Sequence, residues 1–437
     1  MRSYVFLLFY AGLLGSTFAA PFVGALLWCW IAFMNPHREA WGFAQHQPYA
    51  MMIFIVTVFA CIMAREPKRF EANAITVGLI VLAVLFTLTS LLGIGPGVTR
   101  WAMWERVIKT IVGALLVACL LTSRERIHAL VWLMAISIGF YGVKGGAFTF
   151  TTGGGFNVMG PDDSMISDRN HVAVAMLVAL PLMNYLRMQS AHRLVQLGLM
   201  FAMGMTLLGS IGSQSRGALV ALAATACVLW WRSKSKVISG VMIVACIAAV
   251  LNFMPASWEE RMQTITNYEE DASAMGRVRI WEASWLLALQ HPLTGTGFRA
   301  PYYQHIVDQV APHIPARAVH SIYFETLAEH GFPTFLVWLG LSAAGAFYSM
   351  RLTHLARGRP DLAWAGDLGR MVPVSMVAYL TGGIFLSLQY WDYYWILLIV
   401  VAAAHTLAVR QLAAEAPRRA AAATEGWRPR PTQGVSA

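Results

Sequence analysis

The sequence predicts an all-α polytopic membrane protein. Hydrophobic residues make up 57% of the 437 positions and charged residues only 12%, whereas about a quarter of the residues in a soluble globular chain are charged. Apolar runs long enough to cross a bilayer of roughly 30 Å recur along almost the whole chain. The one long polar interruption is residues 255–331. We therefore expect about twelve transmembrane helices and one large, partly helical loop on the external side.

The predicted spans follow one another at short intervals. They lie near residues 49–64, 72–92, 107–122, 127–142, 171–186, 193–209, 217–231, 237–254, 333–350, 371–388 and 391–409. The stretch 4–34 is also apolar but is interrupted at Pro21, so it forms either one broken crossing or two short ones. A proline is tolerated inside a membrane helix where neighbours satisfy the freed carbonyl.

Basic residues decide the orientation, because cytoplasmic loops carry an excess of Lys and Arg. They recur in alternate loops, at Arg65, Lys68, Arg69, Arg124, Arg126, Arg187, Arg193, Arg232, Lys234, Lys236, Arg351, Arg357, Arg359 and Arg370. The same rule places the C-terminal tail, residues 410–437, in the cytoplasm. With Met1 and Arg2 inside as well, residues 4–34 must cross once, which places both termini in the cytoplasm.

This topology predicts four regions. Residues 1–254 hold spans 1–9, residues 255–331 form the external loop, residues 332–409 hold spans 10–12, and residues 410–437 form a disordered cytoplasmic tail rich in Ala, Arg and Pro. The N-terminal apolar stretch lacks a small-residue cleavage pattern, so we expect a retained anchor rather than a signal peptide.

Composition excludes several classes of partner and site. The net charge of +10 comes from short juxtamembrane loops, which suit the anionic headgroups of membrane lipids and present no aromatic-interleaved surface to a nucleic acid. All five cysteines fall inside predicted spans, which excludes a disulfide framework and a zinc site. They are Cys29, Cys61, Cys119, Cys227 and Cys246.

The predicted cytoplasmic face has no room for a nucleotide. Each cytoplasmic loop has about 20 residues or fewer, whereas a nucleotide-binding domain needs about 100 residues. There is no Walker A pattern, and the glycine-rich segments 144–146 and 153–155 lie on the external side. Such a protein draws its energy from a gradient or from an activated substrate, so we expect a transporter or a membrane-embedded transferase.

External arginines are candidate ligands for a phosphate group. Arg216 stands at the outer end of a span, and Arg277, Arg279 and Arg299 belong to the large loop. Guanidinium groups stay charged and match phosphate oxygens bidentately, so several together can hold a diphosphate without a metal ion. The alternative is contact with lipid headgroups or with nearby acids. Those acids are Glu269, Glu270 and Asp271.

His320 is the candidate base, because an imidazole with an ordinary pKa of about 6.5 accepts a hydroxyl proton near neutral pH without a metal. Ser321 follows it, and Glu325 and Glu329 repeat at helical spacing on one face. The alternative is a histidine that hydrogen bonds at the membrane interface. His171, close to Arg169 at the start of another span, is a rival, although a helix cap by Asp168 or Asn170 also accounts for that segment.

Four motifs in this order resemble the bacterial O-antigen ligase superfamily, over roughly residues 170–350. They are Ser215-Arg216-Gly217-Ala218, then Gly276-Arg277 followed by Trp281, then His291-Pro292-Leu293-Thr294-Gly295-Thr296-Gly297-Phe298, and finally His320-Ser321 followed by Gly331 and Thr334. The resemblance implies an all-helical, metal-independent glycosyltransferase that uses a lipid-linked donor, needs no cofactor, and lies in the bacterial inner membrane with its large loop in the periplasm.

By that resemblance, glycan passes from undecaprenyl diphosphate to a hydroxyl of the lipid A core at the periplasmic face, with inversion. His320 would be the base or would position the acceptor. Arg216 and Arg277, with Arg279 nearby, would bind the leaving diphosphate. Further substrate contacts would come from Arg169, His171, Arg299, Ser321 and Glu325.

The acceptor divides the superfamily. We rank a lipopolysaccharide O-antigen ligase first, a protein O-oligosaccharyltransferase second and an O-antigen polymerase third. The N-terminal half also resembles a subgroup of predicted O-glycosylation ligases associated with exosortase systems, but it has Asp168-Arg169-Asn170-His171 where that subgroup tends to carry Asp-Asn-Asn-His. A flippase for lipid-linked glycan is the non-enzyme alternative. Transporters are often built of two related halves, and residues 1–218 and 219–437 share no self-similarity.

Overall fold

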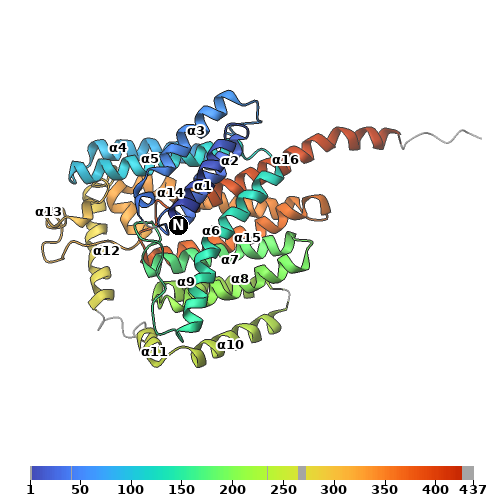
Figure 1. Cartoon of the computed structure of the whole chain (residues 1–437). Coiled ribbons are helices and arrows are strands. Elements are labelled where there is room, and N and C mark those ends of the chain that lie inside the picture. Colours follow the sequence, from blue (N-terminus) through green and yellow to red (C-terminus); the bar gives the residue numbers. More distant parts are fainter. Residues whose placement is uncertain (1, 41, 234, 264–271, 426–437) are drawn as a thin grey trace, which may run out of the picture.

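The computed structural model describes residues 2–40, 42–233, 235–263 and 272–425, and these residues form helices and no strands (Figure 1). The α-helices are α1 (Arg2–Ser16), α2 (Pro21–Met34), α3 (Tyr49–Met63), α4 (Ala74–Leu92), α5 (Gly97–Leu120), α6 (Arg124–Thr151), α7 (Arg169–Gln189), α8 (Arg193–Gly212), α9 (Arg216–Arg232), α10 (Lys236–Phe253), α11 (Ala256–Gln263), α12 (Ala272–Gln290), α13 (Gln304–Val307), α14 (Ile322–Leu355), α15 (Ala363–Gly382) and α16 (Asp392–Glu425). Short 3₁₀ helices lie at η1 (Phe43–His46), η2 (Ala300–Tyr302), η3 (Pro360–Leu362) and η4 (Gly383–Phe385).

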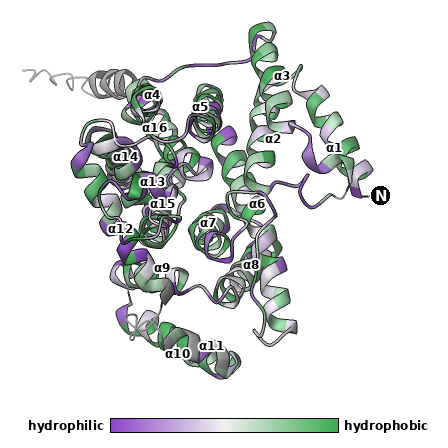
Figure 2. Ribbon diagram, turned by 90° about the vertical axis from the view of Figure 1, so that its left-hand side faces the viewer, coloured by the Kyte–Doolittle hydropathy of each residue, from purple (hydrophilic) through white to green (hydrophobic). Residues whose placement is uncertain are grey.

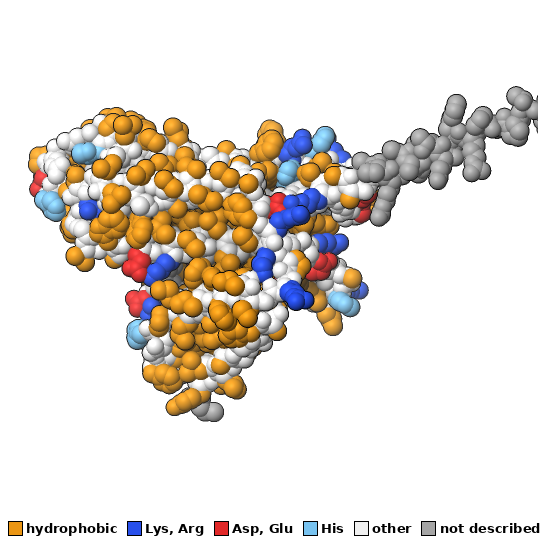
Figure 3. Space-filling model, turned by 90° about the horizontal axis from the view of Figure 1, so that it is seen from above, with side chains coloured by type: hydrophobic (Ala, Val, Ile, Leu, Met, Phe, Trp, Pro, Cys, Tyr) orange, Lys and Arg blue, Asp and Glu red, His pale blue; other side chains and the backbone are white. Residues whose placement is uncertain are grey.

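The predicted class, an all-α polytopic membrane protein, is confirmed. Within the described part of the chain, 8 helices are long and apolar enough to cross a membrane: α4, α6, α7, α8, α10, α14, α15 (with η3 and η4) and the first part of α16. Two shorter apolar helices are α2 and α3. Hydrophobic side chains cover the broad middle of one face, and most Lys and Arg side chains of that face lie toward the end from which α16 extends (Figure 3). The total of about twelve spans stays a prediction.

The N-terminal stretch does not cross once, so that prediction is wrong. Helices α1 and α2 fold back on each other, because the Phe9 ring lies 5.5 Å from the Trp30 ring. The ring of Tyr4 lies 6.0 Å from that of Phe43, so the start of α1 shares an end of the bundle with the 35–48 loop. The predicted topology had put the N-terminus and this loop on opposite sides of the membrane.

The local geometry at Pro21 is compatible with this reversal. Pro21 occupies the first turn of α2, where its missing N–H costs no hydrogen bond. Ala20 before it is extended, with φ −139° and ψ 91°, as steric conflict with a following proline ring favours. The chain therefore begins a new helix at Pro21 instead of bending within one.

Helix α7 lies at the centre of the bundle (Figure 2). Its residues Val172–Ala179 are all buried, and it packs against α6, α8, α9 and α15. Small residues let α6 and α8 approach closely, since a Cβ added at Gly146 would lie 2.1 Å from the Met205 carbonyl oxygen. By contrast, α10 has no buried residue, so its apolar side chains are available to lipid.

Helix α14 is broken at Gly331, where φ is 73° and ψ is 179°. The Ala328 carbonyl loses its helical partner, the Phe332 N–H, which donates instead to the Pro292 carbonyl at 2.8 Å. The partner of the Glu329 carbonyl would be Pro333, which has no N–H. A break of this kind leaves main-chain oxygens that need other donors.

The glycine-rich motif 291–298 supplies those donors. Thr296 N donates to the Ala328 oxygen at 2.9 Å, and Gly297 N donates to the Glu329 oxygen at 2.8 Å. Glycine at 295 is required by a positive φ of 60° and by contact, because an added Cβ would lie 2.3 Å from His330 N. This motif therefore clamps the broken helix.

The polar region 255–331 contains α11, α12, η2, α13 and the first turns of α14. The acids Glu269, Glu270 and Asp271, proposed as partners for external arginines, and Lys234 lie outside the described residues. At the other end, α16 continues past the predicted start of the tail at 410 and ends at Glu425. The remainder of that predicted tail, residues 426–437, also lies outside the described residues.

Candidate functional site

The predicted topology makes residues 93–106, 143–170, 210–216 and the large loop external, and contacts between these segments lie at the end of the bundle where α12 and α13 lie (Figure 1). Ile94 N donates to the Thr296 carbonyl at 3.0 Å. The Gln214 side-chain amide donates to the Gly154 carbonyl at 3.0 Å. These bonds join the loop at residue 94 to that at residue 296, and the loop at residue 154 to that at residue 214. His320 lies in the same region, just before α14.

His320 is half-buried and has a left-handed backbone, with φ of 50°. Burial lowers its pKa to about 4, and the neighbouring Arg277, His171 and Arg317 add to this effect, whereas Asp168 opposes it. The imidazole is therefore neutral at pH 7. One ring nitrogen of a neutral imidazole has a free lone pair, so it can accept a proton or a hydrogen bond from a hydroxyl.

Arg277 lies on α12 one turn before Trp281, so both side chains share a face of that helix. The Trp281 indole N–H donates to the Val319 carbonyl at 2.8 Å, which ties this face to the residue before His320. Arg317 lies beside them, because a Cβ added at Gly276 would fall 1.9 Å from its Nη1 atom. Arg317 was not predicted, although a basic residue three positions before His320 was a visible signal.

Arg216 begins α9 at the same end of the molecule. The Ser215 hydroxyl caps this helix by accepting from Ala218 N at 3.2 Å. A Cβ added at Gly217 would lie 3.1 Å from the Phe385 Cβ, and the Phe385 ring lies 6.2 Å from that of Trp281. The first turn of α9 thus approaches the face of α12 that carries Arg277.

Residues 168–171 hold both a helix cap and a close contact between a histidine and a carboxylate. Asp168 caps α7 by accepting from Asn170 N at 2.8 Å, as the alternative interpretation expected. The Nδ1 atom of His171 lies 3.3 Å from the same Asp168 oxygen. Because Asp168 and His171 both act on the pKa of His320, the start of α7 belongs to the surroundings of that imidazole. Arg169, the first residue of α7, is half-buried there.

Arg279 does not join these residues. It follows Arg277 by two positions, which places it about 200° around the helix, and its side chain is exposed. Ser321, by contrast, is buried at the start of α14, and its hydroxyl has no hydrogen-bond partner within the part of the chain that the structure describes.

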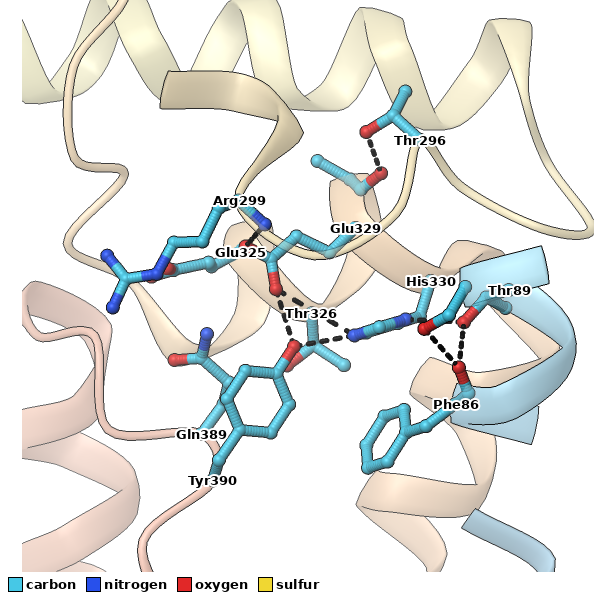
Figure 4. A network of polar contacts seen from close by, with 12 residues as sticks. Phe86, Thr89, Thr296, Arg299, Glu325, Thr326, Glu329, His330, Gln389 and Tyr390 are labelled. Carbon is cyan, nitrogen blue, oxygen red and sulfur yellow. Dashed lines mark hydrogen bonds and ion pairs between the residues drawn. The ribbon is translucent and has the colours of Figure 1, made fainter. Parts of the chain in front are cut away.

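Arg299 and Glu325 belong to a neighbouring buried network (Figure 4). Arg299 N donates to Glu329 Oε1 at 2.7 Å, and its guanidinium lies 4.6 Å from the centre of the Tyr302 ring. The Tyr302 hydroxyl donates to Glu325 Oε1 at 2.7 Å. Burial lowers the pKa of Arg299, but the nearby Tyr302 and the two carboxylates outweigh burial and raise it. Contact between Arg299 and a diphosphate stays a prediction.

The same network crosses the break in α14. The Tyr390 hydroxyl donates to Glu329 Oε2 at 2.5 Å and lies 2.6 Å from His330 Nε2. His330 Nδ1 lies 2.7 Å from the Thr89 hydroxyl of α4 (Figure 4). A buried network whose members are paired fixes a single arrangement of the segments that carry it. Tyr302 and Tyr390 were not predicted, because a tyrosine in an aromatic-rich sequence carries no mark of a polar role.

Two family models match parts of this chain. Residues 200–339 match the family model described as O-Antigen ligase. Residues 1–191 match a family of unknown function (DUF5935). No curated protein matches the chain. The O-antigen ligase match covers Arg216, Arg277 and His320 together with the glycine-rich clamp of α14. The match over residues 200–339 therefore supports membership of this chain in the O-antigen ligase superfamily.

Proposed function

We propose that this protein is an O-antigen ligase, an inverting and metal-independent glycosyltransferase of the bacterial inner membrane. It moves O-antigen glycan from undecaprenyl diphosphate to a hydroxyl of the lipid A core oligosaccharide at the periplasmic face. The observation that carries the proposal is a neutral imidazole, that of His320, beside the guanidinium groups of Arg277 and Arg317. The imidazole accepts the proton of the acceptor hydroxyl, and the guanidinium groups bind the leaving diphosphate.

The guanidinium groups serve the leaving diphosphate. Negative charge grows on the diphosphate oxygens as the glycosidic bond breaks, so fixed cations stabilise the transition state more than the ground state. In this proposal Arg277 and Arg216 bind those oxygens from two helices, and Arg317 adds a third positive charge. A membrane-embedded enzyme of this kind needs no nucleotide, because undecaprenyl diphosphate is itself the activated group.

Donor binding prepares His320 for its role. Without the donor, the neighbouring positive charges help to lower the pKa of this histidine to about 4. A bound diphosphate brings negative charge to the same place, and an opposite charge nearby favours the protonated imidazole. The pKa of His320 therefore rises when the donor binds, and His320 becomes a stronger base when the acceptor hydroxyl must lose its proton.

The test is transfer in vitro with purified protein, undecaprenyl-diphosphate-linked glycan and two competing acceptors, rough lipopolysaccharide and a Ser/Thr-rich periplasmic protein. We expect product on lipopolysaccharide, and none with His320→Ala. His313→Ala is the matched control, because His313 is an exposed histidine of the same region. Product on the protein would select the protein O-oligosaccharyltransferase, elongated lipid-linked glycan would select the polymerase, and glycan movement without transfer would select the flippase.

A further inference from the structure

The backbone of His320 is held in a conformation that it would not adopt alone. Its φ of 50° lies in the left-handed region, where non-glycine residues are uncommon, although histidine is enriched among those that occur there. Such a conformation persists when surrounding contacts hold it, and residues of this kind cluster at functional sites. The contacts that hold His320 are therefore of interest in themselves.

Two hydrogen bonds fix the main chain on either side of the His320 Cα atom. Before it, the Val319 carbonyl accepts from the Trp281 indole N–H at 2.8 Å. At the residue itself, the His320 N–H donates to the Ser387 hydroxyl oxygen at 3.2 Å. Neither Trp281 nor Ser387 touches the imidazole through these bonds, so both act on the direction in which it points.

The Trp281 side of this pair is rigid. Its ring stacks on that of Phe324, with centroids 5.5 Å apart and planes 13° from parallel. Phe324 lies in the first turn of α14, so α12 and α14 hold the loop that carries His320 between them. The indole N–H therefore reaches the Val319 carbonyl from a fixed position.

Hydrogen bonds also fix the main chain next to Ser387. The next two carbonyls along the chain accept from buried aromatic side chains, Leu388 from the Tyr379 hydroxyl at 2.8 Å and Gln389 from the Trp338 indole at 3.1 Å. Side chains of α14 and α15 thus fix the segment that follows Ser387.

We propose that Ser387 and Trp281 are positioning residues, which hold the His320 backbone so that its imidazole meets the acceptor hydroxyl. This inference rests on the proposed function, because it gives His320 its role in transfer. Loss of either hydrogen bond lets residue 320 relax toward ordinary backbone angles and turns the imidazole away from the acceptor. The turnover number kcat should fall, while KM for the donor should stay, because neither residue is placed at the diphosphate.

The variants that test this are Ser387→Ala and Trp281→Phe, which each remove one hydrogen-bonding group and keep most of the side chain. We expect each to lower kcat roughly three- to tenfold, the size that follows from losing one ordinary hydrogen bond, with an unchanged donor KM. Ser387→Thr keeps the hydroxyl and should restore most of kcat. Ser375→Ala is the matched control, since the Ser375 hydroxyl is buried and bonds the Val178 carbonyl at 2.7 Å away from His320.

Hydrogen–deuterium exchange at the His320 amide tests the same idea without the reaction. Exchange should be slow in the wild type and in Ser375→Ala, and roughly tenfold faster in Ser387→Ala, which lacks the acceptor for this N–H. An unchanged exchange rate, or a Ser387→Thr variant as slow in turnover as Ser387→Ala, would overturn the proposal. If the wild type transfers no glycan, the proposed function fails, and the exchange rates still decide whether Ser387 holds His320.

Discussion

At the scale of single residues, the role proposed for His320 depends on the electrostatics around its imidazole. Burial and the neighbouring charges act together on His320, and both keep it neutral. Asp168 is the opposing charge, and burial raises its pKa, but hydrogen bonds from His171 and Asn170 outweigh burial and keep it ionised. The Asp168 carboxylate and the neighbouring arginines thus act on the pKa of this imidazole in opposite directions.

This arrangement predicts the pH dependence of the reaction. The base acts in its neutral form, so kcat/KM should be flat near neutral pH and should fall as pH drops through the free-protein pKa of about 4. Arg277→Gln removes a positive neighbour, which raises the pKa of His320, and so moves this acid limb to higher pH. The measurement is kcat/KM for the donor against pH in both proteins. An acid limb near the ordinary histidine pKa of about 6.5 in the wild type would contradict the assignment.

The two arginines of α12 should differ in their effect on the donor. Arg277→Ala removes a charge that reaches His320, and we expect donor kcat/KM to fall about a hundredfold, as for other fixed groups that stabilise a developing anion. Arg279→Ala changes an exposed side chain on another face of the helix and should cost less than about threefold. Steady-state kinetics at saturating acceptor measures both, and equal losses would show that the face of α12 has been misassigned.

Metal independence is a further prediction of the proposed mechanism. Guanidinium groups neutralise the diphosphate in the proposed mechanism, so transfer should be unchanged in excess EDTA. The check is the initial rate with EDTA and after addition of Mg²⁺ or Mn²⁺. A strict requirement for a divalent ion would move the centre of the reaction toward the exposed acids Asp162 and Asp163.

At the scale of secondary-structure elements, the break in α14 positions the site. Before the break, Glu325 and Glu329 face the buried network of Arg299, Tyr302 and Tyr390. Beyond Gly331, the helix continues at a different angle. The glycine-rich motif 291–298 could have been taken for a phosphate-binding loop, but its N–H groups are used by the carbonyls of α14. Its role in the structure is to stabilise a helix end inside the protein.

The break predicts a stability effect that separates two glycines of one helix. Gly331 has φ 73° and ψ 179°, a combination essentially confined to glycine, so Gly331→Ala should cost about 3 kcal/mol and lower both the melting temperature and the activity. Gly340→Ala is the control, because a Cβ at Gly340 meets nothing within 4 Å and alanine favours a helix. Thermal unfolding in detergent measures both. Equal melting temperatures would mean that α14 is straight.

At the scale of the whole molecule, the reversal between α1 and α2 places the chain start at the same end as the 35–48 loop. Single cysteines at Arg2 and Gln47 in a background without the native cysteines should therefore react alike with a membrane-impermeant thiol reagent in intact cells. A cysteine at Arg65, at the opposite end of α3, should show the opposite reactivity. The prediction fails if Arg2→Cys behaves like Arg65→Cys.

Much of the candidate site could be predicted from the sequence, and the rest could not, for physical reasons. His320, Arg277 and His171 combine reactive chemistry with positions next to predicted spans, so local sequence was enough to select them. Ser387 and Tyr302 have no such local mark. Arg279 looked equivalent to Arg277, because only a neighbouring segment tells one face of an exposed helix from another.

The sequence by itself determined that this is an all-helical membrane protein whose motifs resemble those of the O-antigen ligase superfamily, because hydropathy and motif order are properties of the chain read along its length. Only the tertiary structure decided the rest. At Pro21, a bend and a reversal are both compatible with the local residues, and the packing of Phe9 against Trp30 selects the reversal. The His320 amide meets a hydroxyl 67 positions away, and contacts over such separations arise from packing, which no local pattern encodes.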